Sequence, residues 1–178
     1  FKILAKNFNS PGEKVWLKRR FKEYKIEDKD LSELKSRMDI IPVSIALAQA
    51  ANESGWGTSR FALEGNALFG QWTWSKKGIS PKNKDPNKTH KILQFQVLKA
   101  SVAAYKNNLN THNAYKEFRE VRAQLRQEDK QITGLDLTQY LKNYASIGDK
   151  YVSILEDIIT KNSLTDFDKA NLLPTKLK

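Results

Sequence analysis

Glu53 is the residue whose type and place in the sequence best suit chemistry. It ends the most apolar predicted helix, residues 40–54, for which Asp39 is the expected N-cap. At about 100° per residue, Ala46, Gln49 and Glu53 share one stripe of small or polar side chains, which predicts a groove instead of a packed core. The negative end of the helix dipole also disfavours the charged form of a carboxyl in the last turn.

Tryptophans near this acid favour the same state. Trp56, Trp72 and Trp74 follow Glu53 closely, and their indole rings would shield its carboxyl from water. A carboxyl that stays protonated near neutral pH can protonate the leaving oxygen of a sugar, as glycoside hydrolysis requires. The alternative is a surface glutamate paired with a neighbouring base, which is common at helix ends. For Trp56 and Trp72, a place in the core is the alternative to a sugar platform.

Other chemistries find little support in the residues. The chain has no cysteine, and its two histidines, His90 and His112, lack acidic or histidine partners at metal-ligand spacing. The sequence contains no G-x-S-x-G, P-loop or G-x-G-x-x-G motif. We therefore expect neither a metal nor a cofactor.

Several helices must position the acid. Residues 11–38 predict two scaffold helices, the second with Asp28 or Asp30 as N-cap, and Thr58 is the expected cap of a short helical turn before Gly65 and Asn66. Helical spacing of apolar residues predicts four further helical segments. Their apolar residues are Val97, Val102, Tyr105 and Leu109, then Tyr115, Phe118, Val121 and Leu125, then Leu137, Tyr140 and Leu141, and finally Tyr151, Ile154, Leu155, Ile158 and Ile159.

Two short aromatic runs predict a small β-hairpin. Phe69, Trp72 and Trp74 mark the first run, and Ile92 and Phe95 mark the second. With the helices, this predicts a mainly α, lysozyme-like α+β fold in which a small β-hairpin lobe lies beside the active-site groove.

Length and composition are compatible with one folded domain. At 178 residues, with 39% hydrophobic residues, 8 Gly and 5 Pro, the chain can bury a core and is not a disordered protein. We expect a single domain over residues 1–165, with a helical extension at 1–38 and a charged tail at 166–178. No apolar run approaches the roughly 20 residues of a membrane span, and a first residue other than Met is compatible with a removed targeting segment.

The net charge of +11 favours polyanionic partners. Nucleic acid, anionic lipid and the acidic bacterial wall all qualify, and a solvated basic surface is the alternative. No predicted helix combines a dense basic face with a known docking signature, so we do not expect nucleic-acid binding. We expect a monomer.

The segment AQAANESGWGTSRFALEGNALFGQWTW resembles the signature of bacterial glucosaminidase domains, glycoside hydrolase family 73, and especially the Bax-like subgroup. The resemblance implies that Glu53, in A-x-x-E-S-x-W-G, is the general acid. It also implies that Asn66, Leu68, Phe69 and Gly70 form a turn that shapes the groove.

The resemblance extends over residues 14–162 and implies further site residues. Tyr144, in YASIGDKYVSIL, matches the family's active-site tyrosine, and its hydroxyl would orient a water or the acetamido group of the substrate; a core tyrosine is the alternative. The expected substrate-binding residues are Gln49, Trp56, Asn66, Phe69, Gln71, Trp72 and Trp74.

The chain departs from the family in its second carboxylate. Between Glu64 and Glu117 the only acid is Asp85, which is a candidate catalytic residue, although turn chemistry favours a turn residue before proline. The resemblance implies an endo-β-N-acetylglucosaminidase that acts on peptidoglycan in the periplasm or elsewhere in the cell envelope. A lytic transglycosylase and a non-catalytic wall-binding module stay open.

Overall fold

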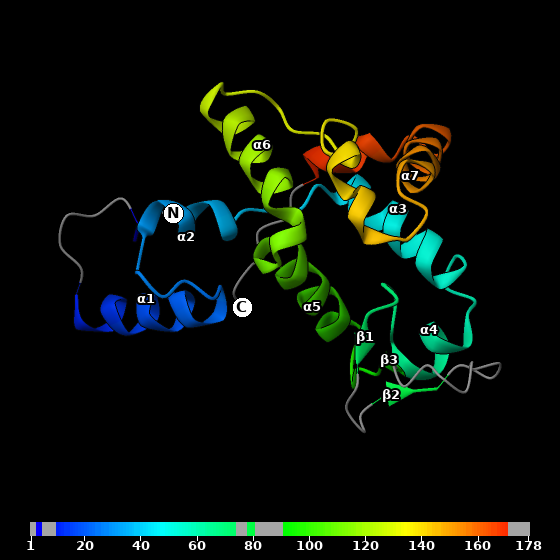
Figure 1. Ribbon diagram of the computed structural model, residues 1–178, viewed down its shortest axis with the longest axis horizontal. Coiled ribbons are helices and arrows are strands. Elements are labelled where there is room, and N and C mark those ends of the chain that lie inside the picture. The colour runs from blue at the N-terminus through cyan, green and yellow to red at the C-terminus, as the bar shows by residue number, and fades with distance from the viewer. Residues whose placement is uncertain (1–2, 5–9, 74–77, 81–90, 171–178) are drawn as a thin grey trace, which may run out of the picture.

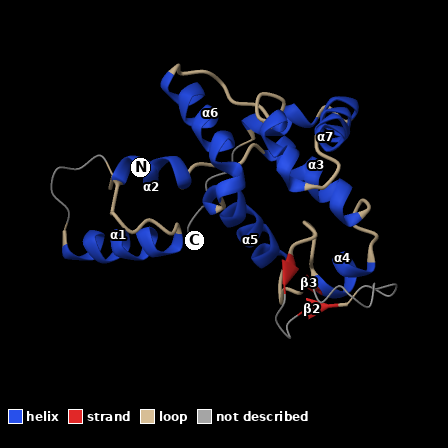
Figure 2. Cartoon of the chain, viewed as in Figure 1, coloured by secondary structure: helices blue, strands red, loops and turns tan. Residues whose placement is uncertain are grey.

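The computed structural model describes residues 3–4, 10–73, 78–80 and 91–170. The chain is mainly helical with one small antiparallel sheet, which confirms the predicted lysozyme-like fold class (Figure 2). The elements in chain order are α1 Pro11–Glu23, α2 Leu31–Arg37, α3 Val43–Ser54, α4 Arg60–Gly65, β1 Trp72–Thr73, β2 Gly78–Ile79, β3 Lys91–Leu93, α5 Leu98–Thr111, η1 Asn113–Tyr115, α6 Lys116–Gln127, η2 Thr138–Tyr144, α7 Asp149–Lys161 and η3 Leu164–Lys169. No helix in these described ranges has both the length and the apolar character of a membrane span.

The first two helices form a small unit of their own. Ser10 and Glu13 make a reciprocal capping box at the start of α1, and Asp30 caps α2 by accepting hydrogen bonds from two backbone amides. The prediction of two scaffold helices is therefore confirmed. Figure 1 shows this pair beside α6, on the side away from α3 and α7. The pair has a separate apolar cluster, made of Leu17, Phe21, Tyr24, Ile26 and Leu34.

Two predicted helix caps were wrong. Helix α3 begins at Val43 because Pro42 disfavours helical backbone at the residue before it, so Asp39 lies too early to cap α3 and instead bonds its own neighbour and Arg126. The hydroxyl of Thr58 donates to the Gly55 carbonyl at 2.6 Å. The cap of α4 is therefore the next residue, Ser59, whose side chain accepts from the backbone of the first turn.

The β lobe has one strand more than the predicted hairpin. Strand β3 lies in the middle and pairs antiparallel with β1 and with β2. A Cβ atom at Gly78 would lie 2.9 Å from the Ile92 carbonyl oxygen, so glycine allows the close pairing of β2 with β3. The lobe lies next to α4, at the end of α3 that carries Glu53 (Figure 1).

The main core lies among the remaining helices. Helix α3 packs against α7 and η3, while η2 packs against α7 and α6. Helices α5, α6 and α7 supply six of the thirteen buried apolar side chains in this core, and α3, η1, η2 and the connecting segments supply the rest. Its buried members include Ile45, Ala48, Phe69, Tyr105, Leu109, Phe118, Leu137, Leu141, Tyr151, Leu155 and Ile159.

We expected the chain to leave the globule at residue 166, but it does not. The 3₁₀ helix η3 continues to Lys169 and packs against α3. The Asp168 carboxylate accepts hydrogen bonds from the backbone amide of Ser44 at 2.8 Å and from that of Gly134 at 2.9 Å. A charged residue near the end of the chain is therefore built into the domain because it satisfies backbone donors there. Residues 171–178 lie outside the described residues.

Candidate active site

The end of α3 places Glu53 where two parts of the fold meet. Gly55 ends the helix in a left-handed conformation, with φ of +57°. The Ser54 hydroxyl donates to the Ala50 carbonyl and accepts from the amide of Gly57, so the turn after the helix is pinned to its last residues. Glu53 is therefore held in the last turn, half-buried, and not in a fraying helix end.

The two oxygens of the Glu53 carboxyl have different neighbours. Oε1 accepts a hydrogen bond from the Tyr151 hydroxyl at 2.8 Å and one from the Asn52 side-chain amide at 3.2 Å. Oε2 faces Gly70, where a Cβ atom would lie only 3.1 Å from it. Gly70 has a φ of +59°, so both its backbone conformation and this close approach favour glycine. One oxygen is thus held by donors, while the other lies against a residue without a side chain.

Gln49 is part of the support of the site and not of its surface. The prediction that it lines a groove was wrong, because its side chain is fully buried. Its Oε1 accepts from the Tyr105 hydroxyl at 2.8 Å, and its Nε2 donates to the Tyr151 hydroxyl at 2.9 Å. A buried polar side chain needs partners for both ends of its amide, and these two tyrosines supply them. Gln49 therefore acts on Glu53 through Tyr151.

Tyr151 is the residue that sequence reasoning missed. It was predicted only as one apolar position of the last strong helix, and it is 1% exposed. Its hydroxyl nevertheless ends on Glu53, 98 residues earlier in the chain. The available signal was a tyrosine in a stripe that is otherwise aliphatic, because a buried tyrosine hydroxyl needs a polar partner.

Tyr144 lies beside the acid, but its hydroxyl is directed elsewhere. It donates to the Phe69 carbonyl at 2.9 Å, and its ring stacks on that of Tyr151 at 5.6 Å between centroids. In this structure Tyr144 therefore connects η2 to the turn before β1. Its predicted catalytic role stays a prediction. Phe69 is 3% exposed and stacks on Tyr105, so it is a wall of the core beneath the site.

The tyrosines around Glu53 stay neutral at physiological pH. Burial raises the pKa of Tyr144 and that of Tyr151 well above the ordinary value for tyrosine, and the Glu53 carboxylate raises both further. Burial also raises the pKa of Tyr115 to about 12, with a smaller contribution from Glu53. These phenols therefore keep their protons near pH 7, and Tyr151 donates its hydrogen bond to the Glu53 carboxyl.

The predicted groove turn follows α4. Asn66 ends that helix with a φ of +50°, and its side-chain amide donates to the Phe95 carbonyl at 3.0 Å, which ties the turn to the segment after β3. Next to Gly70, the Oε1 atom of Gln71 is buried and has no hydrogen-bond partner within the described part of the chain. Asn66 thus shapes the turn, and Gln71 carries an acceptor next to the residue that faces the acid.

Two of the predicted aromatic residues, Trp56 and Trp72, are largely exposed. We expected these rings to shield Glu53 from water, but Trp56 is 65% exposed and Trp72 is 60% exposed. Both are open to solvent and able to stack on a ligand. Trp74 and Asp85 lie outside the described residues.

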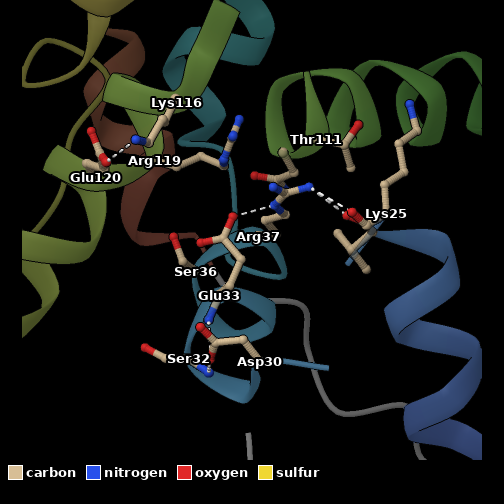
Figure 3. Close-up of polar contacts among 12 residues, drawn as sticks. Lys25, Asp30, Ser32, Glu33, Ser36, Arg37, Thr111, Lys116, Arg119 and Glu120 are labelled. Carbon is tan, nitrogen blue, oxygen red and sulfur yellow. Dashed lines mark hydrogen bonds and ion pairs between the residues drawn. The ribbon is translucent and has the colours of Figure 1, made fainter. Parts of the chain in front are cut away.

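A concave region beside the N-terminal helices lies away from Glu53. It has a volume of about 600 Å³ and is lined by residues of the α1–α2 connection and of α2. Figure 3 shows its polar side chains engaged with one another: Arg37 pairs with Glu33 and also donates to the Tyr24 and Lys25 carbonyls. We therefore locate the candidate active site by the surroundings of Glu53 and not by the size of a hollow.

Comparisons with known proteins identify the family of the chain. The family profile of glucosaminidase, described as mannosyl-glycoprotein endo-beta-N-acetylglucosaminidase, matches residues 28–164. The chain is 40% identical to Protein bax of Escherichia coli (strain K12) over 152 residues, which are 82% of this chain and 54% of that protein. The chain thus spans about half the length of this curated relative. No solved structure matches the chain.

The matched region contains Glu53, Gln49 and Tyr151, and it ends shortly before Asp168. Because the family profile covers most of the chain, the chain belongs to the glucosaminidase family of glycoside hydrolases, and it is similar to Protein bax over 82% of its length.

Proposed function

We propose that this chain is a peptidoglycan hydrolase, an endo-β-N-acetylglucosaminidase that cleaves β-1,4 glycosidic bonds of the wall glycan with Glu53 as general acid. The observation that supports it is the Glu53 carboxyl, held by Tyr151 on one oxygen within the region that matches the family. The protonated carboxyl gives its proton to the glycosidic oxygen as the bond to the anomeric carbon breaks. The carboxylate that results keeps the hydrogen bond from Tyr151, which favours its negative charge.

The second step needs a group that stabilises the positive anomeric carbon. Asp85, the only acid between Glu64 and Glu117, is the candidate for a second carboxylate. The 2-acetamido group of the substrate can take the same role without a second carboxylate. In a lytic transglycosylase, the 6-hydroxyl of the sugar attacks instead of water, and Glu53 is again the acid.

The proposed substrate also explains the charge of the chain. Wall peptides and teichoic acids are anionic, so a net charge of +11 would concentrate the protein on its polymer, and added salt would weaken this effect. The exposed rings of Trp56 and Trp72 are then candidates for stacking on sugar rings. We propose that the protein works in the periplasm or elsewhere in the cell envelope, where this polymer is found.

The test is digestion of purified sacculi followed by mass spectrometry of the released muropeptides. The proposal expects products with reducing N-acetylglucosamine ends from the wild type and none from Glu53→Gln. Glu64→Gln is the matched control, because Glu64 is an exposed glutamate on the next helix, 59% exposed and paired with Arg60, and this variant should cleave normally.

The released products also distinguish the proposed hydrolase from a lytic transglycosylase and from a binding module. Anhydro-sugar ends would identify a lytic transglycosylase, and sacculus binding without release would identify a binding module. Cleavage by Glu53→Gln at the wild-type rate would refute Glu53 as the acid.

A further inference from the structure

The hydrogen bonds around Glu53 form a chain with a direction. The Tyr105 hydroxyl donates to Gln49 Oε1, Gln49 Nε2 donates to the Tyr151 hydroxyl, and the Tyr151 hydroxyl donates to Glu53 Oε1. Tyr105 and Tyr151 are 1% exposed and Gln49 is fully buried, so water does not compete for these groups. Each member of the chain uses its hydrogen on the next member toward Glu53.

The buried end of the chain sets this direction. If the Gln49 amide were reversed, its nitrogen would face the Tyr105 hydroxyl, whose own hydrogen would then need another acceptor in the core. Its oxygen would face Tyr151, and the Tyr151 hydroxyl would turn its hydrogen away from Glu53. The observed orientation satisfies both hydroxyl groups and the amide, so the Tyr105 hydroxyl decides how Tyr151 faces the acid.

This direction makes the two oxygens of Glu53 unequal. Oε1 accepts from both Tyr151 and Asn52, so a proton placed on Oε1 would displace a donor. Oε2 faces Gly70, where no side chain stands between the oxygen and an incoming group.

We propose, on the basis of the function proposed above, that Tyr105, Gln49 and Tyr151 are positioning residues that leave Oε2 as the oxygen of Glu53 that carries and donates the acidic proton. When Oε2 loses its proton to the glycosidic oxygen, the negative charge is shared with Oε1, where the hydrogen bond from Tyr151 strengthens. These three residues, which we call the relay, thus stabilise Glu53 before and after the proton transfer, and none of them gives up a proton.

The kinetic test is a double-mutant cycle on the relay, measured as kcat and KM on soluble wall glycan. We expect Tyr151→Phe to lower kcat about tenfold or more with little change in KM, because the donor to Oε1 is lost. Tyr105→Phe should lower kcat about threefold or more, although its hydroxyl does not touch Glu53. The double variant should be no slower than Tyr151→Phe, because both changes break the same chain. Tyr24→Phe removes a tyrosine of similar burial from the separate α1–α2 cluster and should leave kcat unchanged.

Two outcomes overturn the proposal: an unchanged kcat in Tyr105→Phe, and losses of kcat that multiply in the double variant. If Tyr105→Phe does not fold, Gln49→Glu tests the same point. The new carboxylate can only accept from both tyrosines when ionised, so Tyr151 would donate to residue 49 instead of Glu53, and kcat should fall as in Tyr151→Phe. A kcat that stays at the wild-type value in Gln49→Glu above the pH at which residue 49 ionises would equally refute the relay.

A spectroscopic test separates this proposal from the proposed function. In protein labelled with carbon-13 at tyrosine Cζ, we expect Tyr105→Phe to shift the Tyr151 signal and Tyr24→Phe to leave it in place. We also expect Glu53→Gln to shift the Tyr151 signal, because its acceptor changes. If the wild type fails to cleave sacculi, the proposed function fails while these shifts still report on the relay. If sacculi are cleaved but the Tyr151 signal ignores Tyr105→Phe, the relay is refuted and the function stands.

Discussion

Helix α3, which carries Glu53, begins without a cap from its own sequence. Its N-cap residue is Pro42, which has no side-chain group to accept a hydrogen bond. The missing acceptor is supplied by Asp168 in η3, whose carboxylate accepts from the Ser44 amide at 2.8 Å and from the Ser44 hydroxyl at 2.7 Å. The same carboxylate accepts from the Gly134 amide at 2.9 Å. One side chain thus joins η3, the first turn of α3 and the loop before η2.

Asp168→Ala should therefore destabilise the whole domain. Loss of a side-chain cap costs about 0.5–2 kcal/mol, and hydrogen bonds to a charged group contribute about 1.5–3 kcal/mol each without adding fully. The Gly134 amide keeps a partner in the Ser44 hydroxyl, at 3.0 Å, which limits the loss. We expect the free energy of unfolding to fall by about 3 kcal/mol. For a chain of this length, Tm should then fall by roughly 6–12 °C.

Urea unfolding followed by circular dichroism measures this directly. The midpoint should move to lower urea with an unchanged slope, because the surface exposed on unfolding is the same. Asp166→Ala is the matched control: this carboxylate is exposed on the same 3₁₀ helix, and its loss should change stability by less than about 0.5 kcal/mol. Equal stability of Asp168→Ala and Asp166→Ala would refute the assignment of the remote cap. A chain that ends at residue 164, where the family match ends, should lose at least as much stability as Asp168→Ala, because it also lacks the packing of η3 against α3.

Three further predictions follow from buried or crowded groups. Gly70→Ala should lower kcat at least tenfold, because its methyl group would lie 3.1 Å from Glu53 Oε2. The control is Gly57→Ala, which is also at positive φ but has open space around its Cβ and should keep the wild-type kcat. Equal losses of kcat in the two variants would contradict this prediction. Arg122→Met should lower the free energy of unfolding, measured with urea, by about 3–5 kcal/mol. This arginine is 1% exposed, and the Ile40 carbonyl, the Ser36 carbonyl and the Asn110 side-chain oxygen would lose their donor. A loss below about 1 kcal/mol would contradict this prediction. Burial raises the pKa of Tyr115 to about 12, so the contribution of Tyr115 to stability is complete below pH 10 and falls by about 3 kcal/mol as pH rises from 10 to 12. Urea unfolding at pH 9 and at pH 11.5 should show this drop in the free energy of unfolding. The drop should be smaller in Tyr115→Phe.

The helices were predictable because their signals are local. Apolar spacing predicted α5, α6 and α7, and glycine correctly predicted the end of α3. The caps at Asp39 and Thr58 were wrong because each of these side chains had a competing partner that periodicity does not reveal. The third strand was missed because two residues are too few for an alternating pattern.

For the candidate site, the sequence by itself indicated the family and predicted Glu53 as the candidate acid. The motif around Glu53 and the turn through Phe69 and Gly70 are contiguous in the chain, so a short window of residues contains them. Tertiary structure decided which tyrosine hydroxyl reaches the acid: it directs Tyr151 to Glu53 and Tyr144 to the Phe69 carbonyl.

Tertiary structure also decided what supports the acid, because the partners are far apart in sequence. Tyr151 and Gln49 are separated by 102 residues, and Asp168 and Ser44 by 124. Helical periodicity relates a residue only to neighbours three or four positions away, so it predicts which face is buried but not which polar group meets it there. These hydrogen bonds depend on how the helices pack, because a buried hydroxyl, amide or carboxylate needs a partner and packing decides which polar group lies within reach.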